Sequence, residues 1–380
     1  MKKATNNGSM KLANRQLILD MIRREPISRA DIAQQIELTR ASVTIITEEL
    51  INEGSIYEAE LVQNNGKGRS PVLLMLNPDG TRFGGINLQR DCVEAGIVNI
   101  SGGTLSQTVF PYDGSPPREL IRAACEVLKP SLPTLKGIGI CAPGPLDYRQ
   151  GVVLNPPDFP FWHDFPVLDC VADCLSTDIA LFMENMPNAM ALEEKYFGVN
   201  KDVPNFASLL VDDTGIGLGV VLNDHLLRGA TGLGNEIGHT TVVTDGIPCG
   251  CGNHGCLVKY ASMPALLKDT PFESWHALID RLDSSAQAQA LLEEEAKYLS
   301  VALLNAINML DIELVILKGT IAYNSRALCA MLNHRMAGRI ASRRFRAGVA
   351  ITSSEAPCSV RTAATPAIHG YFSNSIPHRG

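Results

Sequence analysis

The sequence lacks any apolar run that approaches the length needed to cross a lipid bilayer. Residues 1–20 also lack the uninterrupted apolar segment at the centre of a secretory signal. Charged residues make up only 19% of the 380 positions, whereas hydrophobic residues make up 45%. This composition is typical of chains that bury sizeable cores. We therefore expect a soluble, cytoplasmic protein of two or three domains, without membrane contact.

A basic excess is missing as well. The formal net charge is −7, and residues 1–80 contain as many acidic as basic side chains. This charge argues against nonspecific attraction to nucleic acid over the whole surface. A small DNA-reading module remains compatible with it, because such a contact is local.

The ten cysteines do not follow the pattern of a disulfide framework. Three of them, Cys249, Cys251 and Cys256, are interleaved with glycines in one short segment. The others are scattered, mostly within apolar segments, and are best explained as buried free thiols in a reducing compartment. These scattered cysteines are Cys92, Cys125, Cys141, Cys170, Cys174, Cys329 and Cys358.

Residues 15–53 have the spacing of three short helices. Leu17, Ile18, Met21 and Ile22 would share the apolar face of the first helix, which Pro26 ends. The second and third helices have capping residues at the expected positions, and a glycine closes the third. The capping residues are Ser28 and Thr39, and the closing glycine is Gly54.

A strand-like hairpin follows these helices, with the basic turn "NNGKGR" at its tip. Three helices and a basic hairpin predict a winged helix-turn-helix, whose hairpin tip would contact phosphates or the minor groove. The alternative is a small helical bundle that binds protein or nothing. The residues expected to contact DNA are Arg40, Ser42, Val43, Thr44, Lys67 and Arg69.

From Arg82 onward, strand-like and helix-like segments alternate, which predicts two α/β lobes with a cleft between them. Several segments resemble the ROK family, a name that joins repressors, uncharacterised reading frames and sugar kinases. One of them is "SRADIAQQIELTRASVTIITEELINEGSI", and the most specific part is the glycine-to-cysteine run with "TGIGLGVVLNDHLLRGATGLGNEIGH" and "CGCGNHGCL". The resemblance implies a winged helix-turn-helix over residues 1–80. A two-lobed, actin-like and ribonuclease-H-like ATPase (ROK) domain would then follow over residues 81–380.

The resemblance also predicts that kinase activity is lost. ROK kinases carry a catalytic Asp after a Glu-Asn pair, and this sequence has Met186 there, whose thioether cannot accept the hydroxyl proton. The first phosphate-binding turn has become Asn87–Arg90, without the glycines that let phosphate approach the backbone. The glycine-rich segment 214–219 is retained, although it could equally be a simple tight turn. We therefore expect no enzyme activity.

A sugar site is implied by the same resemblance, through Asn155, Asn185, Glu236 and His239. Two acidic contacts of the family are absent, because Met186 and Val258 occupy their positions. Lost carboxylates weaken the recognition of sugar hydroxyls. The sequence therefore leaves two alternatives, a modified ligand or a site that no longer binds sugar.

His239, Cys249, Cys251 and Cys256 supply one imidazole and three thiolates, a full tetrahedral set for one structural zinc ion per chain in the loop 239–256. His254 is the rival fourth ligand, which spacing alone does not exclude, and the resemblance favours His239. Glu236 precedes His239 by three residues, so in a helix both would lie on one face. His239 could then join the metal loop to the ligand site.

Together these features predict a sugar-responsive transcriptional regulator, a repressor rather than an activator. Its partners would be operator DNA, a sugar or sugar derivative, and a second copy in a homodimer or tetramer. One alternative is a ROK-type sugar kinase with a regulatory DNA-binding head. Another is a regulator that takes its signal from a partner protein through the metal-bearing lobe. The sequence does not identify the effector, the operator or the target genes.

Overall fold

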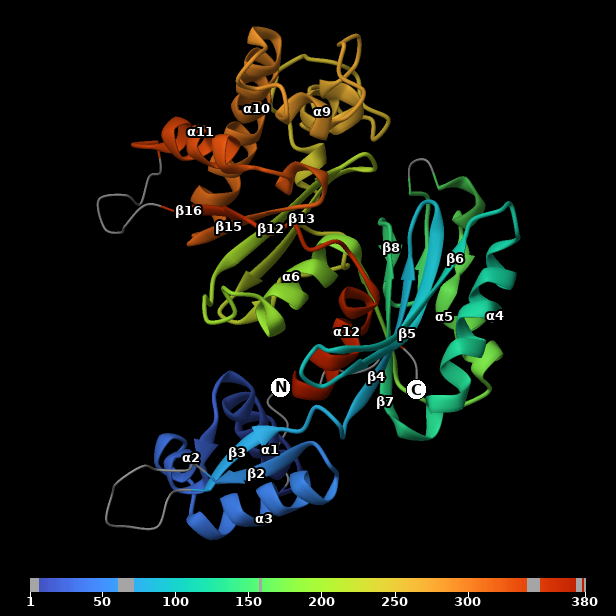
Figure 1. Ribbon diagram of the computed structural model, residues 1–380, viewed down its shortest axis with the longest axis vertical. Helices are drawn as coiled ribbons and strands as arrows, with labels where there is room; N and C mark the ends of the chain where they lie inside the picture. Colours follow the sequence, from blue (N-terminus) through green and yellow to red (C-terminus); the bar gives the residue numbers. More distant parts are fainter. Residues whose placement is uncertain (1–6, 61–71, 157–158, 340–348, 374–377, 379–380) are drawn as a thin grey trace. The chain divides into compact units, whose positions relative to one another are not determined.

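A computed structural model describes residues 7–60, 72–156, 159–339, 349–373 and 378 (Figure 1). The chain forms two compact units. The first contains residues 1–141, 168–183 and 363–380, and the second contains residues 142–167 and 184–362. The first unit therefore includes both the N-terminal helical module and an α/β sheet. The domain boundary that the sequence places after residue 80 stays a prediction.

The N-terminal module has the element order expected of a winged helix-turn-helix, with three helices and a sheet of order β1-β3-β2. Ser28 Oγ accepts a hydrogen bond from the amide of Asp31, and Thr39 Oγ1 accepts one from the amide of Ser42, so both predicted caps are confirmed. Lys67 and Arg69 lie outside the described residues. The elements are α1 (Asn7–Arg24), β1 (Ile27–Ser28), α2 (Arg29–Gln35), α3 (Arg40–Asn52), β2 (Ile56–Glu60) and β3 (Val72–Leu76).

The apolar face of α1 differs from the prediction. Ile18 and Leu19 are fully buried and Ile22 is 3% exposed, whereas Leu17 is 46% exposed. At about 100° per residue, Leu17 lies on the side of the helix opposite the direction midway between Leu19 and Ile22. The expected set fitted the helical period equally well, so only packing against α3 and β3 fixes the rotation of the helix.

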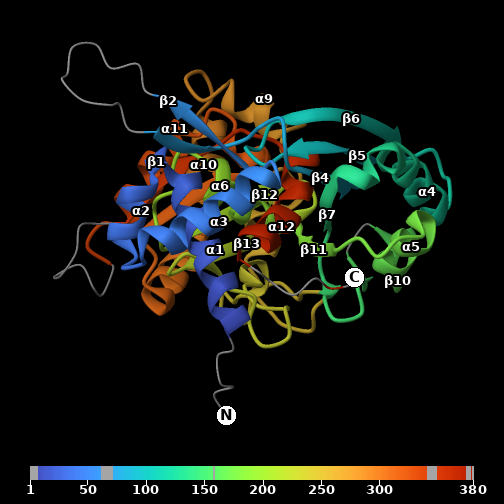
Figure 2. The ribbon, with the colours of Figure 1, turned by 90° about the horizontal axis from the view of Figure 1, so that it is seen from below.

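The α/β sheet of the first unit has the strand order β11-β7-β4-β5-β6. Helices α4 and α5 lie side by side against one face and α12 covers the other (Figures 1 and 2). Gly139 allows α12 to pack closely against the sheet, since a Cβ on this residue would lie 2.1 Å from the Ala363 carbonyl oxygen. The elements are β4 (Arg82–Leu88), β5 (Cys92–Asn99), β6 (Thr104–Pro111), α4 (Pro117–Leu128), η1 (Lys129–Thr134), β7 (Leu135–Ala142), α5 (Val167–Leu175), β11 (Leu181–Asn185) and α12 (Val360–Ser373).

The second unit has a sheet of order β14-β13-β12-β15-β16, with α6 on one face and α10 and α11 on the other (Figure 1). A smaller sheet has the order β10-β9-β8. The strands are β8 (Leu146–Asp147), β9 (Val152–Val153), β10 (Phe165–Pro166), β12 (Phe206–Asp212), β13 (Gly215–Leu222), β14 (His225–Leu226), β15 (Leu314–Lys318) and β16 (Ala350–Ser353). The helices are η2 (Pro160–Trp162), α6 (Met186–Phe197), η3 (Ile237–His239), α7 (Val258–Ala261), α8 (Met263–Leu266), α9 (Trp275–Ile279), α10 (Ala286–Leu310), η4 (Thr320–Ala322) and α11 (Arg326–Met336).

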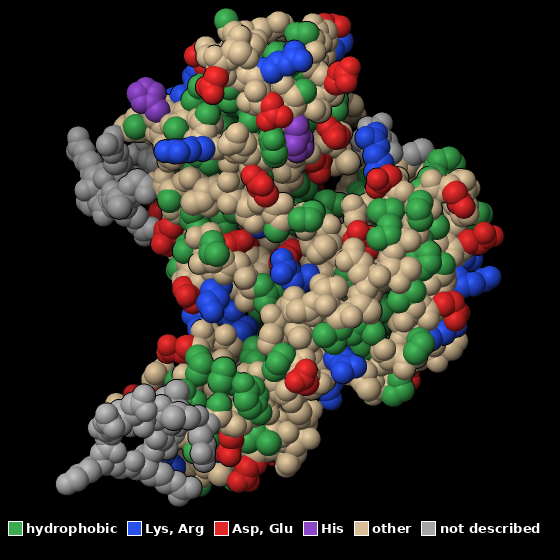
Figure 3. All heavy atoms as spheres, viewed as in Figure 1, with side chains coloured by type: hydrophobic (Ala, Val, Ile, Leu, Met, Phe, Trp, Pro, Cys, Tyr) green, Lys and Arg blue, Asp and Glu red, His purple; other side chains and the backbone are tan. Residues whose placement is uncertain are grey.

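The cysteines agree only in part with the prediction of buried free thiols, because three of the seven scattered cysteines are buried and four are half-buried. Basic and acidic side chains are interspersed on the face drawn in Figure 3. All ten cysteines are free thiols. Among the described residues, no helix combines the length and the hydropathy that a membrane span requires.

Candidate metal cluster and ligand site

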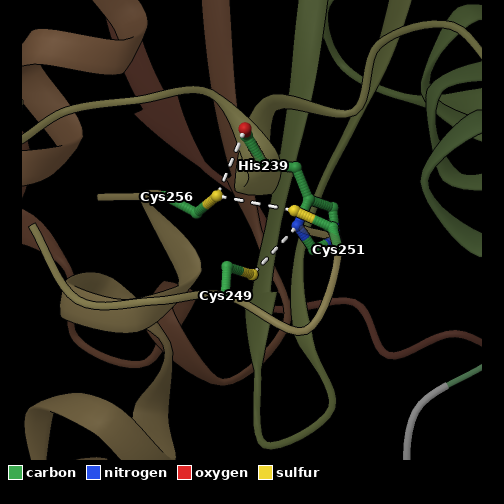
Figure 4. A group of neighbouring side chains, drawn as sticks. All are labelled: His239, Cys249, Cys251 and Cys256. Carbon is green, nitrogen blue, oxygen red and sulfur yellow. Dashed lines mark hydrogen bonds between the residues drawn. The ribbon is translucent and has the colours of Figure 1, made fainter. Parts of the chain in front are cut away.

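Four potential metal ligands meet in the second unit. His239 ends η3, and the three cysteines come from the loop that runs from there to α7 (Figure 4). One ligand atom from each of His239, Cys249, Cys251 and Cys256 lies within 4.8 Å of the others. The structure thus brings together all four residues that the sequence proposed for a metal site.

The spacing within this cluster suits a tetrahedral ion. Cys249 Sγ lies 3.6 Å from His239 Nδ1, and Cys251 Sγ lies 3.7 Å from Cys256 Sγ. Bonds of about 2.3 Å to sulfur and about 2.0–2.1 Å to nitrogen place tetrahedral ligand atoms roughly 3.6–3.8 Å apart. The donor atoms and their separations therefore fit a small, thiophilic divalent cation.

The environments of two of the cluster thiols differ. Cys256 is fully buried, and burial raises the pKa of its thiol to about 12. The pKa of the exposed Cys251 is lowered, chiefly by a hydrogen bond from the backbone of Asn253. A buried thiol with a high pKa becomes a thiolate when a cation binds beside it.

Two glycines shape the loop. Gly252 and Gly255 have φ angles of +91° and +68°, in the region that side chains rarely adopt. A Cβ on Gly255 would also lie 1.7 Å from the Val243 carbonyl oxygen. Gly250, between Cys249 and Cys251, has no positive φ, and a Cβ there would meet no atom within 4 Å. Only the other two are required by the loop.

Hydrogen bonds hold the loop against η3. The amide of Cys249 donates to the Asn253 carbonyl over 2.8 Å, and Asn253 Nδ2 donates to the His239 carbonyl and to Thr241 Oγ1. His254 is exposed, and its carbonyl accepts a hydrogen bond from Thr241 Oγ1. Its imidazole is not a member of the four-residue cluster, which favours His239 as the fourth ligand.

Glu236 lies one turn before the cluster. It precedes the 3₁₀-helix η3, and its carbonyl accepts a hydrogen bond from the His239 amide over 3.0 Å. In a 3₁₀ turn, residues three apart lie over one another. Burial raises the pKa of the Glu236 carboxyl, and nearby His239 lowers it. The expected proximity of Glu236 and His239 is therefore present.

Asn185 marks the junction of β11 and α6. Its Oδ1 caps α6 by accepting from the Asn188 amide over 3.0 Å, which leaves the side-chain amide to donate to a ligand. The Asn185 backbone amide donates to Tyr148 Oη over 3.3 Å. Met186 follows as the first residue of α6 and is half-buried.

Glu184, the carboxylate nearest to Met186 in sequence, is fully buried and already engaged. It forms an ion pair with Arg228 and accepts a hydrogen bond from Asn188 Nδ2 over 3.2 Å. Burial raises the pKa of Glu184, while the positive charge of Arg228 lowers it. The group therefore anchors the segment after β14 to the end of β11.

Contacts within the second unit draw these segments together. A Cβ on Gly217 would lie 2.4 Å from Pro187 Cγ, and one on Gly238 would lie 2.5 Å from the Ile216 carbonyl oxygen. Strand β13 thus lies between the start of α6 and η3. Asn155 is exposed, and the amide of the preceding residue, Leu154, donates to the Pro145 carbonyl. The four residues expected to bind the sugar all belong to the second unit.

In both segments that correspond to phosphate-binding turns of the family, side chains of this chain form hydrogen bonds. Asp212 Oδ1 accepts hydrogen bonds from the amides of Thr214 and Gly215 over 2.8 Å and 3.2 Å. Asn87 is fully buried, and its Nδ2 donates to Glu94 Oε2 over 3.1 Å. Segment 212–215 forms a tight β12–β13 turn, in agreement with the simpler interpretation of that sequence.

The structure corrects one expected DNA contact. Val43 is fully buried among the apolar residues of the N-terminal module, so its side chain cannot reach a base edge. Arg40 is exposed, and Ser42 and Thr44 are half-buried. Sequence reasoning missed Ile45, which is 54% exposed. The helical period could have indicated this exposure, because Val43, Ile46 and Leu50 share the buried side of the helix and Ile45 lies on the other side.

Comparison with known proteins gives a consistent result. A sequence profile described as "ROK family" matches residues 83–357. The xylose repressor of Bacillus subtilis is 29% identical over 347 residues, with 88% of both chains covered. A solved ROK family transcriptional regulator, described as a homologue of the Escherichia coli Mlc protein, superposes with a TM-score of 0.80. It is 24% identical and covers 96% of this chain and 97% of its own.

A kinase structure matches less of the chain. The ROK hexokinase of Thermus thermophilus superposes with a TM-score of 0.65 and 26% identity. The match covers 99% of the hexokinase but 76% of this chain.

Proposed function

Since this chain belongs to the ROK family, we propose that it is a sugar-responsive transcriptional repressor without kinase activity. Residues 1–80 would bind operator DNA, and residues 81–380 would bind the effector. The observation that carries the proposal is coverage. The transcriptional regulator matches 96% of the chain, whereas almost the whole hexokinase matches only 76%. The part without a hexokinase counterpart has the size of the N-terminal module.

Loss of catalysis is supported by the local geometry. Met186 cannot accept a proton, and the Glu184 carboxylate is held by Arg228 and Asn188. The amides of Thr214 and Gly215, which could contact a phosphate, are bonded to the Asp212 side chain instead. A kinase needs both a base and donors for the transferred phosphate.

The effector would bind in the second unit, to Asn155, the side-chain amide of Asn185, Glu236 and His239. With Nδ1 of His239 lying 3.6 Å from Cys249 Sγ, its Nε2 would contact a ligand hydroxyl. The half-buried Met186 and Val258 make the site less polar than one lined by carboxylates. We therefore expect a deoxy, acetamido or otherwise modified sugar to be preferred.

The metal would be one structural zinc ion per chain, held by His239, Cys249, Cys251 and Cys256. Three thiolates and one imidazole complete its coordination without an open position, which is the pattern of structural rather than catalytic zinc. Zinc would fix the loop that carries His239 and thereby hold that imidazole in place.

The response would work by selection between two arrangements of the chain. A sugar that binds one arrangement better than the other lowers the population that fits DNA. A homodimer would place two N-terminal modules on the half-sites of a palindromic operator.

The test is selection of DNA by the purified full-length chain from a random duplex library, followed by binding assays with and without sugars. We expect a palindromic consensus and weaker binding in the presence of at least one sugar. Failure to enrich any sequence would overturn the proposal. The similarity to the hexokinase favours kinase activity as the second candidate. An ATP-consumption assay over the same sugars separates the two, and turnover would contradict the repressor without catalysis.

A further inference from the structure

Helix α3 exposes a large apolar side chain at the middle of its outward face. Val43, Ile46, Thr47 and Leu50 are buried on its inner side. At about 100° per residue, the direction opposite to them is occupied by Ala41, Ile45 and Glu48. Ile45 is 54% exposed, whereas its neighbour Ile46 is 4% exposed.

Ala41, one turn before Ile45, is also exposed, so these two residues form an apolar strip on the outward face. Single exposed hydrophobic residues are common and need no explanation by themselves. Here the strip lies on the helix that, under the proposed function, enters the major groove. In Figure 1, α3 lies along the outer side of the N-terminal module.

Ion pairs neutralise two of the acidic groups near the strip, whereas Glu48, about one turn after Ile45, is exposed on the same outward face. Glu49 is paired with Lys11 and Glu53 with Arg15, each with oxygen and nitrogen 2.5 Å apart. These pairs neutralise acidic groups that would repel phosphates at the flank and C-terminal end of α3. Arg40, the first residue of α3, is exposed and forms no ion pair within the part of the chain that the structure describes. It is free to contact a phosphate beside the groove.

The hydroxyl groups at the same end of α3 are already bonded. Thr44 Oγ1 donates to the Arg40 carbonyl over 2.8 Å. Ser42 Oγ shares a hydrogen bond with Thr39 Oγ1 over 2.9 Å. The centre of the outward face therefore offers apolar contact more readily than hydrogen bonds to base edges.

The 5-methyl group of thymine is the apolar feature of the major groove. Building on the proposed DNA-binding function, we infer that Ile45, with Ala41 beside it, contacts thymine methyl groups. The side chain thereby specifies thymine at one or two positions in each operator half-site. Arg40 positions the helix on the backbone and contributes affinity without sequence preference.

The test uses DNA selected by the full-length chain from a random duplex library. Each thymine of the consensus is then replaced singly by deoxyuridine, which removes only the 5-methyl group. For the wild-type chain, we expect about a threefold or greater loss of affinity at one or two positions per half-site, from the loss of one buried methyl contact. Ile45→Ala should bind the thymine and uracil duplexes equally at those positions.

Two controls separate this effect from damage to the module. Leu12→Ala removes another exposed apolar side chain, 38% exposed and on α1, and should retain the full thymine preference. Ile45→Ala should unfold at the same temperature as the wild type, because the side chain is largely exposed.

The outcomes are distinguishable. If no sequence is enriched, the proposed DNA-binding function fails and this inference fails with it. If a consensus is enriched but uracil substitution has no effect at any position, the function stands and the methyl contact is excluded. A methyl preference that persists in Ile45→Ala would also overturn the assignment of this residue.

Discussion

Arg15 Nη2 donates a hydrogen bond to Tyr371 Oη over 3.0 Å, across 356 positions of the sequence. The guanidinium also lies over the tyrosine ring, 5.3 Å from its centroid. Tyr371 Oη is 2.6 Å from Ser55 Oγ, and its ring meets that of Phe83 edge-on at 5.6 Å. Helix α12, near the end of the chain, is thus bonded directly to the N-terminal module.

We expect Tyr371→Phe to lower the free energy of unfolding by about 1–3 kcal/mol, because it removes the hydroxyl that bonds Arg15 and Ser55. Denaturant unfolding measures the change. Tyr57→Phe is the control, since its hydroxyl is on an exposed residue and contacts the Met75 sulfur at 3.6 Å. Equal losses in the two variants would show that the Tyr371 hydroxyl contributes nothing specific.

Metal content provides the second prediction. The wild-type chain should contain about one zinc per chain, and Cys249→Ser should contain almost none, because the four-ligand set is broken. Elemental analysis of the purified proteins measures this. Cys329→Ser changes a half-buried thiol outside the cluster and should keep its zinc. His254→Ala should also keep it, and loss of zinc in that variant would identify the other histidine as the ligand.

The loop glycines give a matched pair. Gly255→Ala should lower the unfolding temperature and reduce zinc retention, because its φ is +68° and a Cβ would lie 1.7 Å from the Val243 carbonyl oxygen. Gly250→Ala, in the same loop but with free space around it, should leave both quantities almost unchanged. Thermal unfolding with metal analysis compares the two variants. A similar tolerance at both positions would contradict the described loop conformation.

The buried acid Glu295 predicts a dependence of stability on pH. Its two carboxyl oxygens have no hydrogen-bond partner among the described residues, and burial raises its pKa well above 4.5. The folded chain therefore holds a proton that the unfolded chain releases above about pH 4.3. Since the unfolded state then binds fewer protons, this residue lowers stability as pH rises towards its folded pKa, by about 1.4 kcal/mol per pH unit.

We accordingly expect Glu295→Gln to become more stable than the wild type as pH rises above about 5, beyond the ordinary carboxyl pKa of the unfolded chain. Denaturant unfolding at several pH values measures the difference. Glu294→Gln alters the exposed neighbour and should show no comparable trend. A constant difference between Glu295→Gln and the wild type across this range would contradict a neutral, buried Glu295.

Local signals in the sequence were reliable where the interaction is local. Ser28 and Thr39 cap their helices because the bonded amides are three residues away. Packing over longer range was less predictable. Val43 and Ile45 both fit a helix, and only the neighbouring helices and strands decide that the first is buried and the second exposed. The engagement of Glu184 by Arg228 likewise joins positions 44 residues apart.

The sequence by itself predicted the order of the elements and the residue types of the metal cluster, because these depend on period and short spacing, and the resemblance of several segments indicated the ROK family. The tertiary structure decided which histidine joins the three cysteines and which side of α3 is exposed. It also decided that Tyr371 bonds Arg15. These relationships require side chains to meet across the folded chain, and sequence spacing does not specify that geometry.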